Sequence, residues 1–460
     1  MKRSKNSVRV AGQRIPEIRF EDQSLTSFSG VVLLQRLFEV LNLKAQLRAC
    51  VRHLGSSASY HPATMIHLLI VHVMLGWRRL RDIDYYRDDP LVKRALGLRH
   101  MPNVSTLTRA LRAMDLGVVD RLRGFMRKLV LDGLAMFAVR RLTLDFDGSV
   151  VTTKSRNTEG TATGYNPKSK GSRSYYPLLC TVAQTGQVFD LLHRSGNVHD
   201  SKGGPEFIRE CFTHVREAGF DGVLEARMDG AHFSDKTCAM LNDEGVEFTV
   251  SVPFERLSRL KSEVESRKRW NRIDKEWSFF ETKWLPASWI NRGLRCFVYR
   301  HKVRVPRKGP IQLHLFEPVQ REFEYKAVMT NKRLGANGVL QFHNGRGSQE
   351  ATIGELKSNG AFDYIPTRRN IGNQVYAIAC CLAHNLSRRL QMAVKSAERP
   401  QSPRRACLWI FERAATIRDR LIRRAGRLTR PGGRTTLTMA GNAATQRDYA
   451  TYLSAFDQAA

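Results

Sequence analysis

The sequence predicts a mixed α/β fold in which a helical region precedes a sheet. Apolar residues recur at helical spacing between residues 24 and 135. After Val139 the pattern changes to strand-like alternation, interrupted by amphipathic stretches of helical period. The predicted order up to Val252 is a strand, a hairpin of two strands, a helix, a strand, a helix and a strand. This order suits a mixed sheet, in which functional residues gather where strands end.

The charge of the chain predicts a polyanionic partner. Its 460 residues contain 75 Lys and Arg against 43 Asp and Glu, a net charge of +32, and this length favours two or more domains. A field of this sign and size attracts nucleic acid above other partners. We expect no membrane partner, because the basic N-terminus lacks an apolar leader. The longest apolar run, from Met65 to Leu75, is too short to span a bilayer.

The cysteines indicate a reducing compartment. The chain contains eight of them, and no two form a CxxC pair. We therefore expect neither a zinc site nor a disulfide framework, and we expect a cytoplasmic protein that works on nucleic acid.

Within the helical region, residues 102–112 favour a helix-turn-helix. Ser105 is a natural N-cap for the helical stretch that follows it. That helix would carry Arg109 and Arg112 toward DNA. An ordinary connection in a helical bundle, with solvated arginines, explains the same residues equally simply.

The elements after the helical region are expected to alternate between strands and helices. They are a strand from Leu142 to Asp147, a basic loop from Lys154 to Arg173, a hairpin turning at Thr185-Gly186, a helix over 207–215, a strand ending at Asp229, a helix capped by Ser234 and a strand ending near Val252.

From Pro253 to Glu324 the sequence predicts a β-rich insertion. Four tryptophans lie there in basic sequence, and the stretches LRCFVYRHKVRV and IQLHLFEP alternate like strands. The α/β pattern resumes with the strand YKAVMTN and continues in helices through Gln391. A last helix with a basic set of arginines is expected over residues 409–428.

Carboxylates at the ends of strands are the candidates for chemistry. Asp145 and Asp147 are two residues apart on one strand and so point to the same face. Such a pair is costly to bury unless a cation neutralises it, although a solvated strand end is the simpler alternative. Asp229 ends a second strand, and Gly230 leaves room beside it. For Asp229 the alternative is an ordinary acid in a strand-to-helix turn.

A third acid, Glu350, lies on a helix that also carries a base. Gly345 and Gly347 disfavour a continuous helix, and Ser348 can cap a new one that runs to about Ser358. Lys357 then lies two turns beyond Glu350 on the same face, with Arg346 just ahead of the helix. These residues could hold a metal ion and a phosphate together, although an amphipathic helix with outward charges fits the same pattern.

Taken in order along the chain, these segments resemble a known family. The spacing of His343, Arg346, Glu350 and Lys357 resembles the Y-(2)-R-(3)-E-(6)-K signature of bacterial insertion-sequence DDE transposases. LDFDGS resembles the first-aspartate strand of the family called IS-thirteen-eighty, GYNPKSKGSRSYYPLL the segment after it, and RMDGAHFS the second-aspartate strand. The β-rich stretch before the glutamate also matches, so the resemblance extends from about Ser24 to Gln391.

The resemblance implies a ribonuclease-H-like catalytic core with two Mg²⁺ ions, for which Mn²⁺ can substitute. Its catalytic metal ligands would be Asp147, Asp229 and Glu350, and Asp145 is the alternative to Asp147. Arg346 and Lys357 would bind phosphates near the scissile bond, as their hydrogen-bond donors allow. The tyrosine of the signature is His343 here. A histidine can donate to a phosphate but titrates near neutrality, which leaves its role open.

The resemblance also implies a division of the chain. The parts are a helical DNA-binding region (1–135), the first part of the ribonuclease-H-like core (136–252), the β-rich insertion (253–324), the second part of the core with the catalytic glutamate (325–395) and a basic C-terminal segment (396–460).

The implied activity is cut-and-paste DNA transposition. The helical region would bind terminal inverted repeats, and cleavage at the element end would free a 3′-hydroxyl that attacks target DNA. Because two ends must be held, a homodimer on the bacterial nucleoid is implied. The rivals are a catalytically inactive DNA-binding regulator and a metal-dependent nuclease that cuts without joining. No member of the presumed triad is replaced, which is evidence against the regulator.

Overall fold

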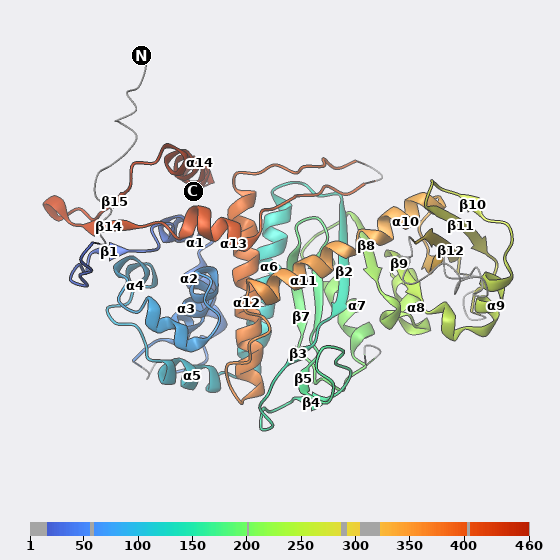
Figure 1. The fold of residues 1–460 in the computed structure, drawn as a ribbon, viewed down its shortest axis with the longest axis horizontal. Coiled ribbons are helices and arrows are strands. Elements are labelled where there is room, and N and C mark those ends of the chain that lie inside the picture. The colour runs from blue at the N-terminus through green and yellow to red at the C-terminus, as the bar shows by residue number, and fades with distance from the viewer. Residues whose placement is uncertain are drawn as a thin grey trace, which may run out of the picture.

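A mixed sheet of nine strands forms the centre of the protein (Figure 1). The computed structural model describes residues 16–55, 59–199, 202–286, 292–303, 323–402 and 405–459. Across the sheet the strand order is β10-β11-β12-β13-β9-β8-β2-β6-β7. The strands are β2 (Arg141–Gly148), β6 (Leu178–Val182), β7 (Gln187–Leu192), β8 (Val223–Met228), β9 (Glu247–Val252), β10 (Asn271–Arg272), β11 (Trp277–Thr282), β12 (Arg295–Lys302) and β13 (Phe323–Thr330).

The pairing makes the sheet mixed, which confirms the predicted fold class. β2 is parallel to β8 and β8 is parallel to β9, whereas the other neighbours are antiparallel. The predicted hairpin at Thr185-Gly186 is also confirmed, since it joins β6 to β7 and Gly186 has a φ of 60°. Because β2 and β8 run in the same direction, their carboxyl ends meet at one edge of the sheet.

Helices cover both faces of the sheet. The long helix α12 (Asn370–Met392) packs on the face that carries Leu179, Val188 and Leu191. Helices α7 (Gly204–Glu217) and α8 (Asp235–Asp243) cover the face that carries Phe146 and Cys180. Apolar side chains thus alternate between two cores, as the strand period of two requires.

A helical bundle precedes the sheet, at the blue end of Figure 1. Its helices are α1 (Val31–Val40), α2 (Leu43–Cys50), α3 (Pro62–Met74), the 3₁₀ helix η2 (Leu80–Tyr85), α4 (Pro90–Leu96), α5 (Val104–Arg112) and α6 (Leu116–Ala135). The apolar run around Met65 is the buried helix α3, which packs against α2 and α12. None of the described helices combines the length and apolar character needed to cross a membrane.

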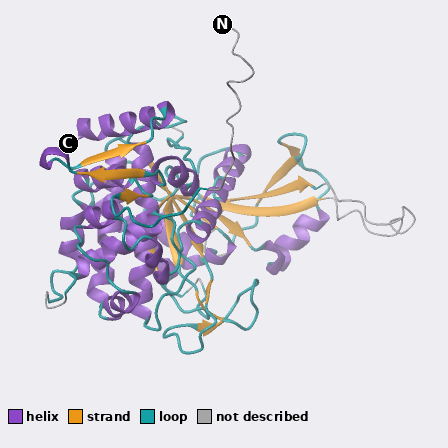
Figure 2. Cartoon of the chain, turned by 60° about the vertical axis from the view of Figure 1, so that its left-hand side comes forward, coloured by secondary structure: helices purple, strands orange, loops and turns teal. Residues whose placement is uncertain are grey.

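The segment after β9 is not purely β-structured. A short 3₁₀ turn, η4 (Phe254–Arg256), and a helix, α9 (Ser258–Ser266), precede β10, β11 and β12, which extend the sheet to one side (Figure 2). The helix follows from apolar residues at Leu260 and Val264, one turn apart and both buried. Trp289 and the predicted strand IQLHLFEP lie outside the described residues.

The remaining elements are short or lie near the chain ends. They are β1 (Leu25–Thr26), β3 (Val151–Thr152), β4 (Ala162–Thr163), β5 (Arg173–Tyr175), η3 (Gly230–His232), α10 (Ala336–Asn344), α11 (Gly347–Ser358), α13 (Ala414–Ile417), a π-helical turn (Arg418–Ile422), β14 (Gly426–Thr429), η9 (Pro431–Gly433), β15 (Thr436–Met439) and α14 (Ala443–Ala459).

The helix predicted over residues 409–428 is wrong in most of its length. Helical backbone covers only residues 414–422, and Gly426 begins strand β14, which pairs with β1 and β15. The Gly426 backbone passes so close to Thr438 and Ser29 that a side chain would collide with them. Pairing with distant strands therefore overrides the local helical pattern.

Candidate active site

Asp145 and Asp147 lie on the same strand but differ completely in their surroundings. Asp145 is fully buried and accepts two hydrogen bonds of 2.6 Å from Arg227, its neighbour in the register of the parallel strand β8. Both of its oxygens are therefore used by a bidentate ion pair. Asp147, two residues nearer the edge of the sheet, has a side chain that is 20% exposed. Of the two, only Asp147 is open to a ligand.

Asp229 follows β8 at the same edge of the sheet. Phe146 and Met228 are partners in the parallel register, so Asp147 and Asp229 are the next residues on adjacent strands. One carboxylate oxygen of Asp229 accepts a hydrogen bond of 3.0 Å from the amide of Ala231, which caps the 3₁₀ turn η3. This bond fixes the start of the turn while the other oxygen remains available.

Glu350 reaches the same edge from the first turn of α11. The helix is fixed to the sheet by the buried amide of Gln349, which donates to the backbone oxygens of Asp145 (2.8 Å) and Leu179 (3.3 Å). Figure 1 shows α11 crossing the sheet between α10 and α12. In the sequence, Gln349 stands out only as a polar residue next to Glu350. The burial of its side chain against the sheet follows from the fold alone.

The boundary between α10 and α11 is less of a break than its glycines predict. Gly345 and Arg346 both have right-handed helical backbone angles, and Ser348 lies inside α11 and does not cap it. Gly345 is needed for space, because a side chain there would collide with the guanidinium of Arg227. Gly345 therefore allows close approach to β8 more than it ends a helix, whereas a side chain at Gly347 would meet no neighbour.

Arg346 joins two of the three carboxylates. Its guanidinium lies 2.9 Å from Glu350 and 3.5 Å from Asp147. Burial, followed by the negative charges of Asp229 and Glu350, raises the pKa of Asp147 to about 7, although Arg346 opposes the rise. The three acids and the arginine thus form one electrostatic cluster.

Lys357 lies beside this cluster on α11. Its ammonium group donates to the backbone oxygen of Val150 at 2.8 Å. Burial lowers the pKa of Lys357, and the positive charge of Lys168 in the basic loop adds to this, whereas Asp363 and Asp147 oppose it. The cation of Lys357 is therefore held next to the end of β2.

His343 is not part of the exposed site. Its side chain is only 2% exposed and forms hydrogen bonds with Thr249 (3.0 Å) and Ser251 (2.9 Å) of β9. Burial lowers the pKa of His343 to about 3, so the ring is neutral at physiological pH and ties α10 to the sheet.

Arg109 and Arg112 are not brought to the carboxylates either. Both are exposed on α5, which begins at Val104 with Asn103 in the N-cap position instead of Ser105. Arg109 donates only within its own helix, to Ser105 and Thr106.

The donor chemistry of the cluster fits a divalent cation, although no closed metal cage is formed. Asp147, Asp229 and Glu350 offer the hard carboxylate oxygens that Mg²⁺ prefers. In the described part of the chain, no three His, Cys, Asp or Glu side chains are gathered closely enough to hold an ion. Arg346 instead supplies positive charge between two of the acids.

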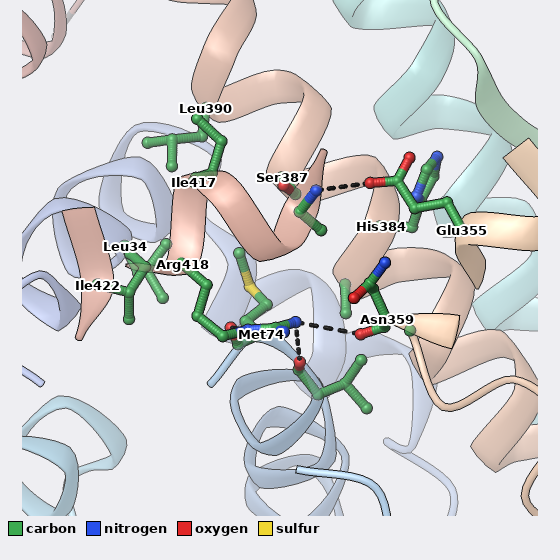
Figure 3. Close-up of a pocket in the computed structure, with 14 residues that line it drawn as sticks. Leu34, Met74, Glu355, Asn359, His384, Ser387, Leu390, Ile417, Arg418 and Ile422 are labelled. Carbon is green, nitrogen blue, oxygen red and sulfur yellow. Dashed lines mark hydrogen bonds between the residues drawn. The ribbon is translucent and has the colours of Figure 1, made fainter. Parts of the chain in front are cut away.

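The side of α11 that faces away from Glu350 is anchored in the interior, beside a cavity of about 30 Å³ (Figure 3). Glu355 pairs with Arg388 of α12 and accepts from the amide of Ala414 at 2.6 Å. Arg418 is 7% exposed and donates to the backbone oxygens of Val73, Met74 and Asn359 at 3.0–3.3 Å. The C-terminal segment and α3 thus hold the end of α11.

Comparison with known proteins agrees with this geometry at the level of the family. The chain matches the family described as transposase DDE domain group 1 over residues 9–460. Comparison with curated proteins gives no significant match. One similar solved structure is a cryo-EM structure of a piggyBac transposase synaptic complex with hairpin DNA. Its chain is 11% identical, with 82% of this chain and 78% of that chain covered at a TM-score of 0.44.

Proposed function

The chain belongs to the DDE transposases, in the family described as transposase DDE domain group 1, and we propose that it cuts and joins DNA at the ends of an insertion sequence. The single observation that best supports this is the convergence of Asp147, Asp229 and Glu350 in one electrostatic cluster at the edge of the sheet. We further propose that the sheet is a ribonuclease-H-like core, and that the element belongs to the group called IS-thirteen-eighty.

The proposed catalytic residues are those of the cluster. Asp147, Asp229 and Glu350 would hold two divalent cations, Mg²⁺ or Mn²⁺, whose charge would activate the attacking oxygen and stabilise the leaving oxygen. Asp145 is set aside as a ligand because Arg227 occupies both of its oxygens. Arg346 and Lys357 are proposed to donate to oxygens of the scissile phosphate.

The reaction would proceed in two steps at this site. In the first, a water oxygen attacks the phosphorus at the element end, and the bond to the 3′-oxygen of the element breaks. In the second, that 3′-hydroxyl attacks a phosphorus of target DNA, the bond from this phosphorus to the 3′-oxygen of the target strand breaks, and the target is left with a free 3′-hydroxyl while the element is joined to its 5′ side. Gln349 keeps α11 against β2 during both steps, because its amide is bound to two backbone oxygens of the sheet.

The remaining parts are assigned to DNA binding and assembly. The helical region, with Arg109 and Arg112 exposed on α5, is proposed to contact the terminal inverted repeats. A homodimer is proposed, because two element ends must be held together for joining. His343 is not proposed as a phosphate contact, since it is buried between α10 and β9.

The test is strand cleavage of a duplex that carries the element's own end, with Mg²⁺, for the wild type and Glu350→Gln. We expect metal-dependent nicks from the wild type and a loss of roughly a hundredfold or more in the variant, with unchanged DNA binding. Glu217→Gln, on the exposed side of α7, is the matched control. Equal cleavage by both proteins would refute the assignment of Glu350.

The same experiment separates the rival functions. DNA binding with no cleavage by the wild type would identify a regulator. Cleaved ends that never enter a target plasmid would identify a nuclease that cuts without joining.

A further inference from the structure

A second cleft lies where the helical bundle meets the end of α11. It has a volume of about 430 Å³ and is lined by Arg79, Leu80, Arg81, Val104, Thr108, Tyr364 and Pro366. This volume is in the range of ligand clefts, ~300–1,000 Å³. Its walls come from η2, from the first two turns of α5 and from the loop that follows α11.

The two arginines of the cleft have no acidic partner. Arg79 and Arg81 are exposed, and neither guanidinium forms an ion pair within the described ranges of the chain. Burial and the negative charge of Asp82 raise the pKa of Tyr364, whereas a hydrogen bond with the backbone of Leu80 and the positive charges of Arg79 and Arg81 oppose the rise. Two cations and one carboxylate therefore act at the Tyr364 wall, so the cleft has a net positive charge.

The other walls suit a sugar and a phosphate. Val104, Leu80 and Pro366 are apolar, and the N-terminus of α5 has no side-chain cap. The first amides of a helix lack intrahelical acceptors and favour an anion. This adds to the charge of the two arginines, which remain the main attraction.

The cleft is rigidly connected to the candidate active site. Arg78, directly before Arg79, donates to the backbone oxygen of Lys357 at 3.2 Å and pairs with Asp363 at 2.6 Å. Glu350 and Lys357 are seven residues apart, which is roughly 10 Å along a helix, or about three base pairs of DNA at ~3.4 Å each. The cleft lies beyond Lys357, on the far side of Arg78, and is therefore farther from Glu350 than this length.

We propose that this cleft holds the DNA backbone beyond the third base pair from the cut, with Arg79 and Arg81 each on one phosphate. The inference rests on the proposed function and extends it, because it gives the path of DNA from the catalytic carboxylates to α5. The contact is with the backbone, so it reads no sequence. Its role is to set the register of the duplex on the catalytic site.

The first test is the salt dependence of DNA binding by the double variant Arg79→Gln, Arg81→Gln. Each lost phosphate contact lowers the slope of log K against log salt concentration by ~0.9, so a fall of about 1.8 is expected. The fall should be equal for an element-end duplex and a scrambled duplex. Thermal unfolding should be unchanged, since neither side chain forms a hydrogen bond or ion pair with the residues that the structure describes.

The matched control is Arg209→Gln, Arg216→Gln. Both residues are exposed on α7, which is proposed to make no DNA contact and is no part of the cleft, so the control removes the same charge and should keep the wild-type slope. The double variant Arg79→Lys, Arg81→Lys should also keep it. A wild-type slope in the glutamine variant, or an equal fall in the Arg209 and Arg216 control, would overturn the inference.

The second test locates the contact. All eight native cysteines are buried, so Arg81→Cys introduces the single exposed thiol of the protein. We expect it to form a disulfide with a thiol tethered to a phosphate just beyond the third base pair from the cut and not with one ten base pairs away. The reverse pattern would refute the position.

Failure of the inference and failure of the proposed function give different results. A wild type that binds and cuts DNA, with a glutamine variant of unchanged slope, refutes the cleft alone. A wild type that neither binds nor cuts any duplex refutes both.

Discussion

Arg346 lies where positive charge is most needed in the metal-free protein. It contacts Glu350 and Asp147, two of the proposed metal ligands, and it is also a proposed phosphate contact. It cannot do both at once. Binding of a cation to the carboxylates should therefore compete with Arg346, and binding of DNA, which draws the guanidinium toward a phosphate, should relieve that competition.

The first prediction is that Arg346→Gln binds Mn²⁺ more tightly than the wild type when no DNA is present. An ion pair of this exposure contributes up to ~1 kcal/mol, which corresponds to a dissociation constant about fivefold lower in the variant. Electron paramagnetic resonance of free Mn²⁺ measures it directly. Weaker binding by the variant would show that Arg346 does not compete with the metal.

The second prediction separates Asp145 from Asp147. Asp145→Asn leaves the buried charge of Arg227 poorly compensated and should cost about 3–5 kcal/mol of stability. The folded-state pKa of Asp147, about 7, is above its ordinary value, so its favourable contribution is complete below pH 4 and lost as pH rises through 7. Asp147→Asn, which stays neutral, should therefore be up to ~3 kcal/mol more stable than the wild type at pH 8.

Urea denaturation at pH 8 and cleavage assays test this pair of variants together. Asp147→Asn should be stable and inactive. If Asp147→Asn still cleaved DNA, Asp145 would again be a candidate metal ligand.

At the scale of single residues, the sequence predicted which acids to consider but not how to choose between two of them. Asp145 and Asp147 share one face by spacing alone. The choice depends on Arg227, which a neighbouring strand supplies 82 residues away. The sequence offers one signal for this choice, because Arg227 lies within the apolar strand that ends at Asp229. A buried arginine needs an acidic partner, so one of the two aspartates had to pair with it. His343 matched a signature by position, but its burial follows from packing against β9.

Helix α11 has two differently used sides. Glu350 faces the carboxylate cluster, whereas Glu355, about 140° around the helix, is 11% exposed and paired with Arg388. The first side is open to ligands and the second is fixed to α12 and the C-terminal segment (Figure 3). The same residue type is therefore a proposed metal ligand on one side of the helix and a structural ion-pair partner on the other.

The third prediction compares the same substitution on these two sides. Glu355→Gln leaves Arg388 buried without a counter-charge and should destabilise the protein by about 3 kcal/mol. Glu350→Gln should change stability by less than ~1 kcal/mol and abolish cleavage. Urea denaturation and the nicking assay measure both effects. If Glu350→Gln proved the more destabilising variant, the division of α11 into two sides would be wrong.

At the scale of elements, the sequence predicted the sheet better than the C-terminal segment. In strands β2 and β8, side chains alternate between the two faces of the sheet, and both faces are buried. The local sequence pattern and the tertiary packing therefore agree. Over residues 409–428 a helical pattern competes with pairing to β1, some 400 residues earlier. No local signal reveals a partner at that distance.

Buried histidines set the acid stability of the whole molecule. Burial lowers the pKa of His67, His72, His193 and His384 to about 4 and that of His343 to about 3. These values lie below the ordinary 6.5, so the unfolded chain binds more protons between pH 4 and 6.5. Their contribution to stability is present above pH 6.5 and lost as pH falls. The raised pKa of Asp147 has the opposite effect on proton uptake, but it concerns a single group.

The fourth prediction follows from this balance. The metal-free protein should lose stability below pH 6.5 with the uptake of up to four protons on unfolding, a slope of at most ~5 kcal/mol per pH unit. His67→Phe, whose ring would pack on Phe38 as the histidine does, should reduce the uptake by one proton. Urea denaturation between pH 7 and 5 provides the slope. A slope that His67→Phe leaves unchanged would exclude this histidine as a source.

The meeting of β1 with β14 has a consequence for how the protein is made. The amides of Ser29 and Gly30 donate to the backbone oxygens of Arg424 and Ile422, and a side chain at position 30 would collide with Leu421. During synthesis, the first helix must therefore wait for residues made nearly 400 codons later before its packing is complete. A nascent chain still on the ribosome would hold an unfinished helical bundle, so the proposed DNA contact would mature only after the proposed catalytic residues had already been made.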